Sequence, residues 1–179
     1  MSGPLATGGP VRSGPLIVTA QMAAADFAWL DRQRRAYFPA ERNVLHAHLT
    51  MFHALPPSAE EEVRRELARQ AAGPKPQARI AGLLNLGRGV AYRVVSDDLE
   101  RVRREIASHF HGSLSAQDGQ GWRPHVTIQN KVEPATARGL LRELEAEFEP
   151  RSLGIDGLSL HRYLGGPWER LGTWSFRGR

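Results

Sequence analysis

The stretch HLTMFHALPPSAEEEVRREL, residues 48–67, is written a second time as HVTIQNKVEPATARGLLREL, residues 125–144. Two histidines, two threonines and two prolines align between the copies: His48 with His125, Thr50 with Thr127, and Pro57 with Pro134. The pattern of each copy predicts a strand, a turn and a helix over about twenty residues. Two copies of such a unit predict two lobes related by an approximate two-fold axis.

The rest of the chain alternates between strand and helix patterns. Strands are predicted over 15–21, 45–55, 122–132, 152–166 and 168–176, with a hairpin over 78–96 that turns at 87–89. Helices are predicted over 23–38, 56–73, 97–112 and 133–148, the second with Ser58 as its N-cap. Residues 1–13 are expected to form a flexible tail, and residues 14–179 a single domain. Frequent hairpins favour an α+β, bilobal fold: two mainly antiparallel sheets flanked by helices, with a cleft between the lobes.

Composition narrows the class of protein. The hydrophobic fraction of 41% and the charged fraction of 24% are typical of a soluble globular chain, and we expect a cytoplasmic monomer. The absence of cysteine excludes disulfides, thiolate metal ligands and a cysteine nucleophile. A net charge of +5 favours an anionic partner such as nucleic acid, although the strong preference for Arg over Lys is also a common result of genomic base composition.

The paired motifs carry a specific chemistry. Residues two apart in a strand point to the same face, so His48 points with Thr50 and His125 with Thr127. Facing lobes would place two imidazoles and two hydroxyls in one cleft. Phosphodiester transfer needs a base for the attacking oxygen and an acid for the departing one, each worth roughly 10²–10⁴ in rate, and threonine hydroxyls can hold the phosphate oxygens. This device needs no metal or other cofactor and suits a 2′,3′-cyclic phosphate.

Other interpretations of the histidines stay open. His46 shares a face with His48, so a metal site from His46, His48, His125 and a carboxylate is an alternative. A purely structural duplication is another, because the apolar positions alone would build a core. His53 is interpreted as structural. His109 and His111 end a helix and are interpreted as caps, and His161 has no assigned role.

The motifs HLTM and HVTI, with Pro124 before the second, resemble the paired signatures of the two-histidine (2H) phosphoesterase superfamily. Within it, residues 14–179 are most similar to the bacterial 2′-5′ RNA ligase and RNA 2′,3′-cyclic phosphodiesterase branch. The resemblance implies metal-independent opening of cyclic phosphate ends of RNA to a 2′-phosphate, with 2′-5′ ligation as the reverse reaction. It implies His48 as the acid, His125 as the base, and Thr50 and Thr127 as phosphate ligands.

The resemblance has one departure. Members of the RNA branch often carry Arg five residues after the second histidine, where this chain has Asn130, followed by Lys131. Small cyclic nucleotides are therefore an alternative substrate to RNA ends. A non-catalytic RNA- or nucleotide-binding module on the same fold is a second alternative.

Further candidates for substrate contact lie beside the motifs or in loops. Aromatic side chains there can stack on a base, and arginine or lysine can bind phosphate. The aromatic candidates are Tyr37, Phe38, Trp122 and Trp168, and the basic candidates are Arg42, Arg88, Arg123 and Lys131.

Overall fold

Two four-stranded antiparallel sheets form the frame of the protein in the computed structural model, which describes residues 13–178. The first sheet has the order β2 (Leu49–Leu55), β1 (Leu16–Met22), β7 (Ile155–Tyr163), β8 (Trp168–Ser175). The second has the order β5 (His125–Gln129), β4 (Val90–Val95), β3 (Ala78–Asn85), β6 (Arg151–Leu153). Every neighbouring pair is antiparallel. The predicted fold class is confirmed.

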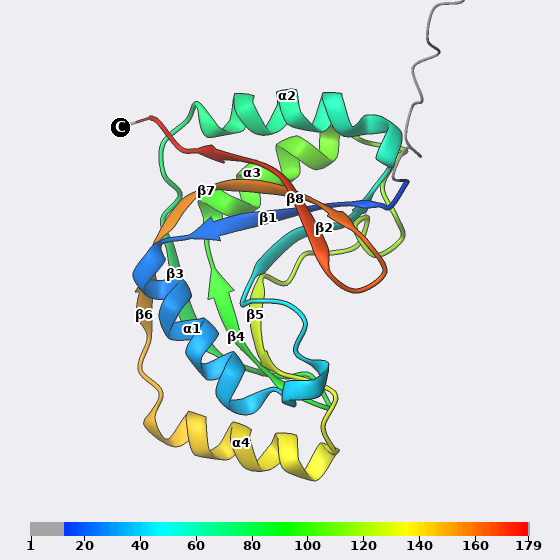
Figure 1. Ribbon diagram of the computed structural model, residues 1–179. Helices are drawn as coiled ribbons and strands as arrows, with labels where there is room; N and C mark the ends of the chain where they lie inside the picture. The colour runs from blue at the N-terminus through cyan, green and yellow to red at the C-terminus, as the bar shows by residue number, and fades with distance from the viewer. Residues whose placement is uncertain (1–12, 179) are drawn as a thin grey trace, which may run out of the picture.

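Four α-helices of the described residues flank the sheets (Figure 1): α1 (Ala24–Tyr37), α2 (Glu60–Ala71), α3 (Asp97–His109) and α4 (Pro134–Glu147). Helix α2 packs on β7 and β8, and α4 packs on β3 and β4. Helix α1 packs on β5 of the second sheet, although the strands on either side of it belong to the first. The two lobes are therefore interlocked by a helix that crosses between them.

The sequence repeat appears as two equivalent strand–helix units. Strand β2 is followed by α2, and β5 by α4. Each of these strands is the edge strand of its sheet, and β2 and β5 lie against each other. The histidine–threonine motifs therefore meet where the sheets adjoin.

Three predicted boundaries were wrong or fall outside the described residues. Ser58 is not an N-cap: it lies in the 3₁₀ turn η2 (Pro57–Ala59), and α2 begins at Glu60 after Ala59 without a side-chain cap. The strand predicted over 152–166 is two strands, because the chain passes from the second sheet to the first at Gly154. A Cβ there would lie 2.6 Å from the Cβ of Ala23, so only glycine fits. Apart from Ser13, the tail predicted over 1–13 lies outside the described residues.

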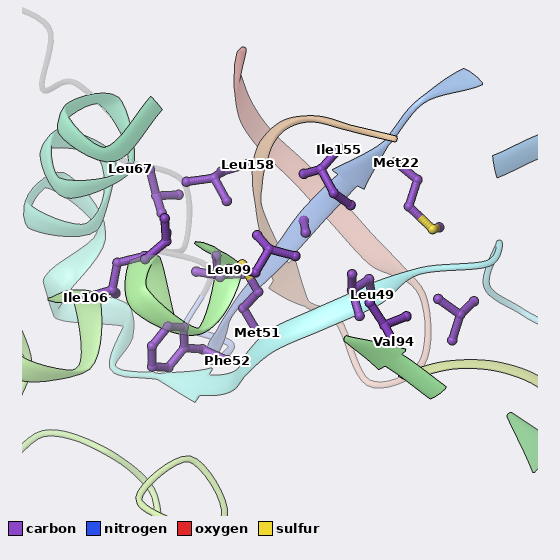
Figure 2. Packing of buried hydrophobic residues seen from close by; sticks show 14 of the residues in the cluster. Met22, Leu49, Met51, Phe52, Leu67, Val94, Leu99, Ile106, Ile155 and Leu158 are labelled. Carbon is purple, nitrogen blue, oxygen red and sulfur yellow. The ribbon is translucent and has the colours of Figure 1, made fainter. Parts of the chain in front are cut away.

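The hydrophobic core joins residues of the first sheet, α2 and α3 with residues of the second sheet such as Val94, Val126 and Ile128, and Figure 2 shows part of it. In Figure 2, Leu67 of α2, Ile106 of α3 and Leu158 of β7 lie in one part of this core. Met51 of β2 lies near Leu99 of α3, and Leu49 of β2 lies beside Val94 of β4. Each of these side chains is buried. Because β2 turns its leucine and methionine into this core, its threonine and the preceding histidine point the other way. None of the described helices is long and apolar enough to cross a membrane.

Candidate active site

His48 and His125 are held by the same local hydrogen bond. The Nδ1 of His48 lies 2.8 Å from the carbonyl oxygen of His46, and the Nδ1 of His125 lies 2.7 Å from that of Arg123. A carbonyl oxygen only accepts, so Nδ1 carries the proton in both rings. In a neutral ring the lone pair is then on Nε2. Both histidines therefore offer Nε2 as the atom that can take up and return a proton.

Thr50 and Thr127 have free hydroxyls and restrained backbones. Among residues 13–178, neither hydroxyl has a protein hydrogen-bond partner. The carbonyl of Thr50 accepts a 3.0 Å bond from the indole Nε1 of Trp122, and the carbonyl of Thr127 accepts a 3.0 Å bond from the Nη1 of Arg34. Each threonine is thus fixed by a side chain from outside its own sheet, and its hydroxyl remains available to an oxyanion.

Two buried arginines support these strands. Arg34 of α1 donates to the Asn43 side chain at 2.8 Å as well as to Thr127, and its guanidinium lies 4.4 Å from the Phe38 ring centroid. Arg103 of α3 donates to the carbonyls of Met51 (2.9 Å) and Asp118 (2.8 Å). Each arginine satisfies backbone oxygens of a motif-bearing strand or of the loops beside it. Sequence reasoning missed both, since α1 and α3 carry several arginines and nothing in their spacing marks the buried ones.

His48 lies in an environment that favours its neutral form. Burial lowers its pKa to about 4, and the positive charge of Arg34, His161 and His125 acts in the same direction, while the bond to the His46 carbonyl opposes it. Part of this burial comes from Trp168, whose ring centroid lies 4.7 Å from that of His48. Without a bound anion, His48 is therefore neutral at pH 7.

A third histidine, His161, lies on the other side of Trp168, at 5.3 Å between ring centroids. Its Nε2 is 3.0 Å from the hydroxyl of Thr19. Burial, with a smaller effect from the charge of Arg170, lowers the pKa of His161 to about 4. The sequence left His161 unassigned, because only the pairing of β7 with β1 and the curl of the β7–β8 hairpin bring it toward His48.

A pocket of about 710 Å³ opens beside His48 on the first sheet. Its walls come from β1, the start of α1, the loop before His48, β7 and the start of β8, and include His48, His161 and Trp168. No residue of the second sheet lines it. Each sheet therefore carries one histidine–threonine motif, but of the two sheets only the first lines this cavity.

The predicted aromatic contacts divide into two groups. Trp168 lines the pocket, but its ring faces two histidines, and Trp122 is half-buried against the backbone of Thr50. Phe38 is buried beneath Arg34, which suits packing and not base stacking. Tyr37 is half-buried at the end of α1 and packs against the core.

The predicted basic contacts lie mainly around the second motif. Arg123 is exposed two residues before His125. Arg42 donates to the carbonyl of Lys131 at 3.4 Å, so these two cations lie together beyond the end of β5. Arg88 donates to the carbonyl of Val132 at 3.1 Å and is placed to hold the turn after β5.

The position where relatives carry arginine is occupied by a local contact. Asn130 accepts a 2.8 Å bond from the backbone of Lys131, a residue in the left-handed region at φ 62°. An exposed arginine lies elsewhere on this lobe: Arg93 of β4 is directly opposite His125 and therefore on the same face of the sheet. Its guanidinium lies over Gly82, with Nη2 3.3 Å from the carbonyl of Ala81. Sequence reasoning missed Arg93 because strand register decides it.

The other histidines have structural partners. His46 is exposed, with its Nδ1 3.3 Å from Asp31, and within residues 13–178 no three His, Cys, Asp or Glu side chains are grouped so that they could hold a metal ion. His53 binds the buried carboxylate of Asp118 at 3.1 Å, as its structural interpretation predicted. His109 lies in the last turn of α3, as predicted, but its Nε2 pairs with Glu62 of α2 at 2.8 Å. His111 is exposed just after α3.

The model of the 2′-5′ RNA ligase superfamily matches residues 22–167. Among solved structures, TT0787 of Thermus thermophilus is similar with a TM-score of 0.62 and 16% identity, over 92% of this chain and 99% of that one. E. coli LigT complexed with 3′-AMP is similar with a TM-score of 0.57 and 16% identity, over 92% and 98% of the two chains. At these identities the likeness shows a common fold. A comparison with proteins of curated function found no match.

Proposed function

The chain belongs to the 2′-5′ RNA ligase superfamily, and on that premise we propose that it opens 2′,3′-cyclic phosphate ends of RNA to 2′-phosphates. The observation that carries the proposal is the matched pair of histidines, each with Nδ1 donating to a carbonyl two residues earlier and Nε2 left for the substrate. The free hydroxyls of Thr50 and Thr127 supply the phosphate ligands. The enzyme class, a phosphoesterase or RNA ligase, follows from the family.

The reaction then needs only two proton transfers. Nε2 of His125 takes a proton from water as the water oxygen attacks phosphorus. The bond from phosphorus to the ribose 3′-oxygen breaks, and Nε2 of His48 donates a proton to that oxygen, leaving a 2′-phosphate. The threonine hydroxyls donate to the non-bridging oxygens, where charge develops. With an RNA 5′-hydroxyl in place of water, the same transfers form a 2′-5′ bond.

The lowered pKa of His48 adds a condition to this scheme. A neutral imidazole cannot act as an acid, so His48 must gain a proton before the 3′-oxygen departs. A bound phosphodiester carries a negative charge, which favours the protonated ring. We therefore include in the proposal that the phosphate and a proton bind together at His48, while His125 provides the base.

The test is an RNA with a 2′,3′-cyclic phosphate end, incubated with the protein in excess chelator, followed by identification of the product. We expect a 2′-phosphate, and loss of at least 10²-fold in turnover for either His48→Ala or His125→Ala. His111→Ala, at an exposed histidine away from the cleft, is the matched control and should retain full activity.

The same assay separates the alternatives. Binding of RNA without turnover by any variant would identify a non-catalytic module. Loss of activity in chelator would indicate a metal hydrolase. Turnover of nucleoside 2′,3′-cyclic phosphates but not of RNA ends would show that the substrates are small molecules.

A further inference from the structure

The face of the second sheet that carries His125 and Thr127 also carries arginine. Arg93 of β4 lies directly opposite His125, and the residue opposite Arg93 on β3 is Gly82. Directly opposite residues of antiparallel strands share a face. The guanidinium of Arg93 lies over Gly82, where a Cβ would be 3.5 Å from Nη2. The arginine therefore extends from β4 toward β3, away from β5, along the face that carries His125.

Two further arginines share this face. The backbone N–H of Val94 donates to the carbonyl of Pro124 at 3.0 Å, so the pairing with β4 continues one residue before β5 begins. The next step of this register places Arg123 opposite Val95, and Val95 pairs with Arg79 on β3. The arginine face therefore consists of three exposed side chains, those of Arg79, Arg93 and Arg123.

No carboxylate within the sheet neutralises the arginine face. Strands β3, β4, β5 and β6 contain no Asp or Glu. Among residues 13–178, the guanidinium groups of Arg79 and Arg123 have no hydrogen-bond or ion-pair partner, and that of Arg93 has only the 3.3 Å bond to the carbonyl of Ala81. Three cations without acidic partners on one face concentrate positive potential there, which attracts an anion.

The first sheet repeats the local geometry of Arg93 without its charge. The equivalent position is Gln21, one residue beyond the pair of Ala20 with Leu49, and Gln21 also lies opposite a glycine, Gly157. At this position the two lobes therefore differ by one positive charge. The charge lies on the side of His125, the proposed base.

The position of Arg93 suits a phosphate other than the reacting one. Strand β3 is the second strand from β5, and neighbouring strands are about 4.8 Å apart, so a guanidinium over Gly82 lies roughly 10 Å along the sheet from β5. A phosphate held by Nε2 of His125 and the hydroxyl of Thr127 stays near β5. The cation is therefore placed for the next phosphate along a nucleic acid strand, one nucleoside away.

From this placement we infer that the arginine face binds a second RNA strand, the one whose 5′-hydroxyl takes the place of water at His125. Arg93 contacts the phosphate on the 3′ side of the 5′-terminal nucleoside, and the other two arginines extend the positive surface beside it. Arginine suits this role because its planar fork binds two phosphate oxygens at once.

The inference rests on the proposed function and adds a preference between its two outcomes. The 5′-oxygen bonds to phosphorus as its proton passes to Nε2 of His125. The bond from phosphorus to the 3′-oxygen breaks, and Nε2 of His48 gives that oxygen a proton. A strand held at Arg93 keeps its 5′-hydroxyl beside His125, so the joining of two strands competes with hydrolysis.

The first test measures binding and needs no turnover. Uridine and uridine 3′-(methyl phosphate), both with a free 5′-hydroxyl, are titrated at several salt concentrations while the ring signals of His125 are followed by NMR. We expect the phosphate to strengthen binding by about three- to tenfold, and Arg93→Gln to remove this difference. The slope of log affinity against log salt should fall by about 0.7 in Arg93→Gln and be retained in Arg93→Lys, which keeps the charge.

The matched control is Arg142→Gln, which removes the same charge at an exposed position of α4. Helix α4 lies on the other face of the sheet, where Phe148 at its end contacts Tyr92. This variant should bind both ligands as the wild type does, with the same dependence on salt.

The second test identifies the strand that the arginine face holds. An RNA with a 2′,3′-cyclic phosphate end is incubated with an excess of UpUpU, and the joined and hydrolysed products are counted. We expect the ratio of joined to hydrolysed product to fall by about three- to tenfold in Arg93→Gln and to stay at the wild-type value in Arg142→Gln. The melting temperature of each variant shows that it is folded.

The outcomes for the inference and for the proposed function are separable. Equal affinities for the two ligands, or an Arg93→Gln variant with unchanged affinity and salt dependence, would overturn the inference even if cyclic phosphates are turned over. An unchanged product ratio in Arg93→Gln would overturn the assignment to the 5′-hydroxyl strand. If no cyclic phosphate is turned over, the proposed function fails, and phosphate-dependent binding that Arg93→Gln removes would still support the arginine face.

Discussion

The indole N–H of Trp122 donates a 3.0 Å hydrogen bond to the carbonyl of Thr50, so a residue just before the second motif holds the threonine of the first. Arg34 does the equivalent for Thr127 from the other side. These two bonds restrain the strands that carry the two histidine–threonine motifs. The fold itself thereby sets the distance between the two motifs.

Trp122→Phe keeps the ring but removes the donor to Thr50. A hydrogen bond of this kind contributes about 1 kcal/mol, so we expect kcat to fall by roughly fivefold with little change in the melting temperature. Steady-state kinetics on an RNA with a 2′,3′-cyclic phosphate end measures kcat. Trp29→Phe is the control, because Trp29 packs on the ring of Tyr92 and, among the described residues, forms no hydrogen bond to either motif. An unchanged kcat for Trp122→Phe would contradict the positioning role.

Trp168→Leu opens the cavity around His48 to water. Since burial is the main cause of the low pKa of His48, we expect this pKa to rise from about 4 toward the ordinary value near 6.5. Titration of the histidine ring signals by NMR measures it, with His48→Ala used to assign the resonance. A pKa that stays near 4 would show that the tryptophan does not desolvate His48.

Phosphate binding is expected to draw a proton from solution. If the pKa of His48 rises when the anion binds, affinity for inorganic phosphate strengthens as pH falls from the pKa of the bound state to about 4, and levels off below that. Calorimetry in buffers of different ionisation enthalpy counts the protons taken up. His48→Ala should abolish this uptake at about pH 5, where inorganic phosphate stays singly charged and changes its own charge least. Uptake equal to that of the wild type would assign the proton to another group.

Mild acid is expected to destabilise the protein through its buried histidines. His48 and His161 have pKa values of about 4 when folded but near 6.5 when unfolded. Between these values the unfolded chain binds more protons, so stability falls as pH drops from about 6.5 to 4 and is unaffected by these groups above that window. Allowing for partial exposure, the loss is roughly 1–2 kcal/mol per histidine. Denaturant unfolding at pH 7 and 5 should show a smaller loss for His161→Gln than for the wild type.

Asp118 is expected to be a strong stability determinant. It is almost fully buried and accepts backbone bonds from His53 and Ala54 as well as one from the His53 ring. Burial alone would raise the pKa of Asp118, but these bonds outweigh it and lower that pKa. Asp118→Asn should cost roughly 2–4 kcal/mol, lowering the melting temperature by about 5–15 °C. Glu143→Gln, at an exposed position of α4, should change it little.

That each motif points its histidine and its threonine to one face could be predicted, because the face on which a side chain lies depends only on strand parity, which the sequence states directly. The repeat also predicted two lobes related by an approximate two-fold axis. Contacts between residues far apart in the sequence could not be predicted. Arg34 donates to the carbonyl of Thr127, 93 positions away, and Trp122 donates to the carbonyl of Thr50, 72 positions away. Arg32 and Arg35 lie beside Arg34 in the same helix, yet both are exposed.

Short-range errors have equally local causes. Ser58 follows two prolines and enters a 3₁₀ turn, so its side chain is not placed at the start of α2. Residues 152–166 were predicted to form one strand because the hydrophobic pattern continues on both sides of Gly154, where the chain passes from β6 to β7. The position of His161 beside Trp168 depends on how the β7–β8 hairpin curls toward β2 (Figure 1). No pattern in the sequence predicts that curl.

The order of strands in the first sheet, β2-β1-β7-β8, has a consequence for how the protein is made. Strands β1 and β2 leave the ribosome early, but their partners β7 and β8 are residues 155–175, near the end of the described chain. The second sheet needs nothing after residue 153 and can be complete before them. During synthesis His48 therefore lacks its neighbours Trp168 and His161 until they are translated, and a nascent chain halted before β7 carries both histidine–threonine motifs without a finished pocket.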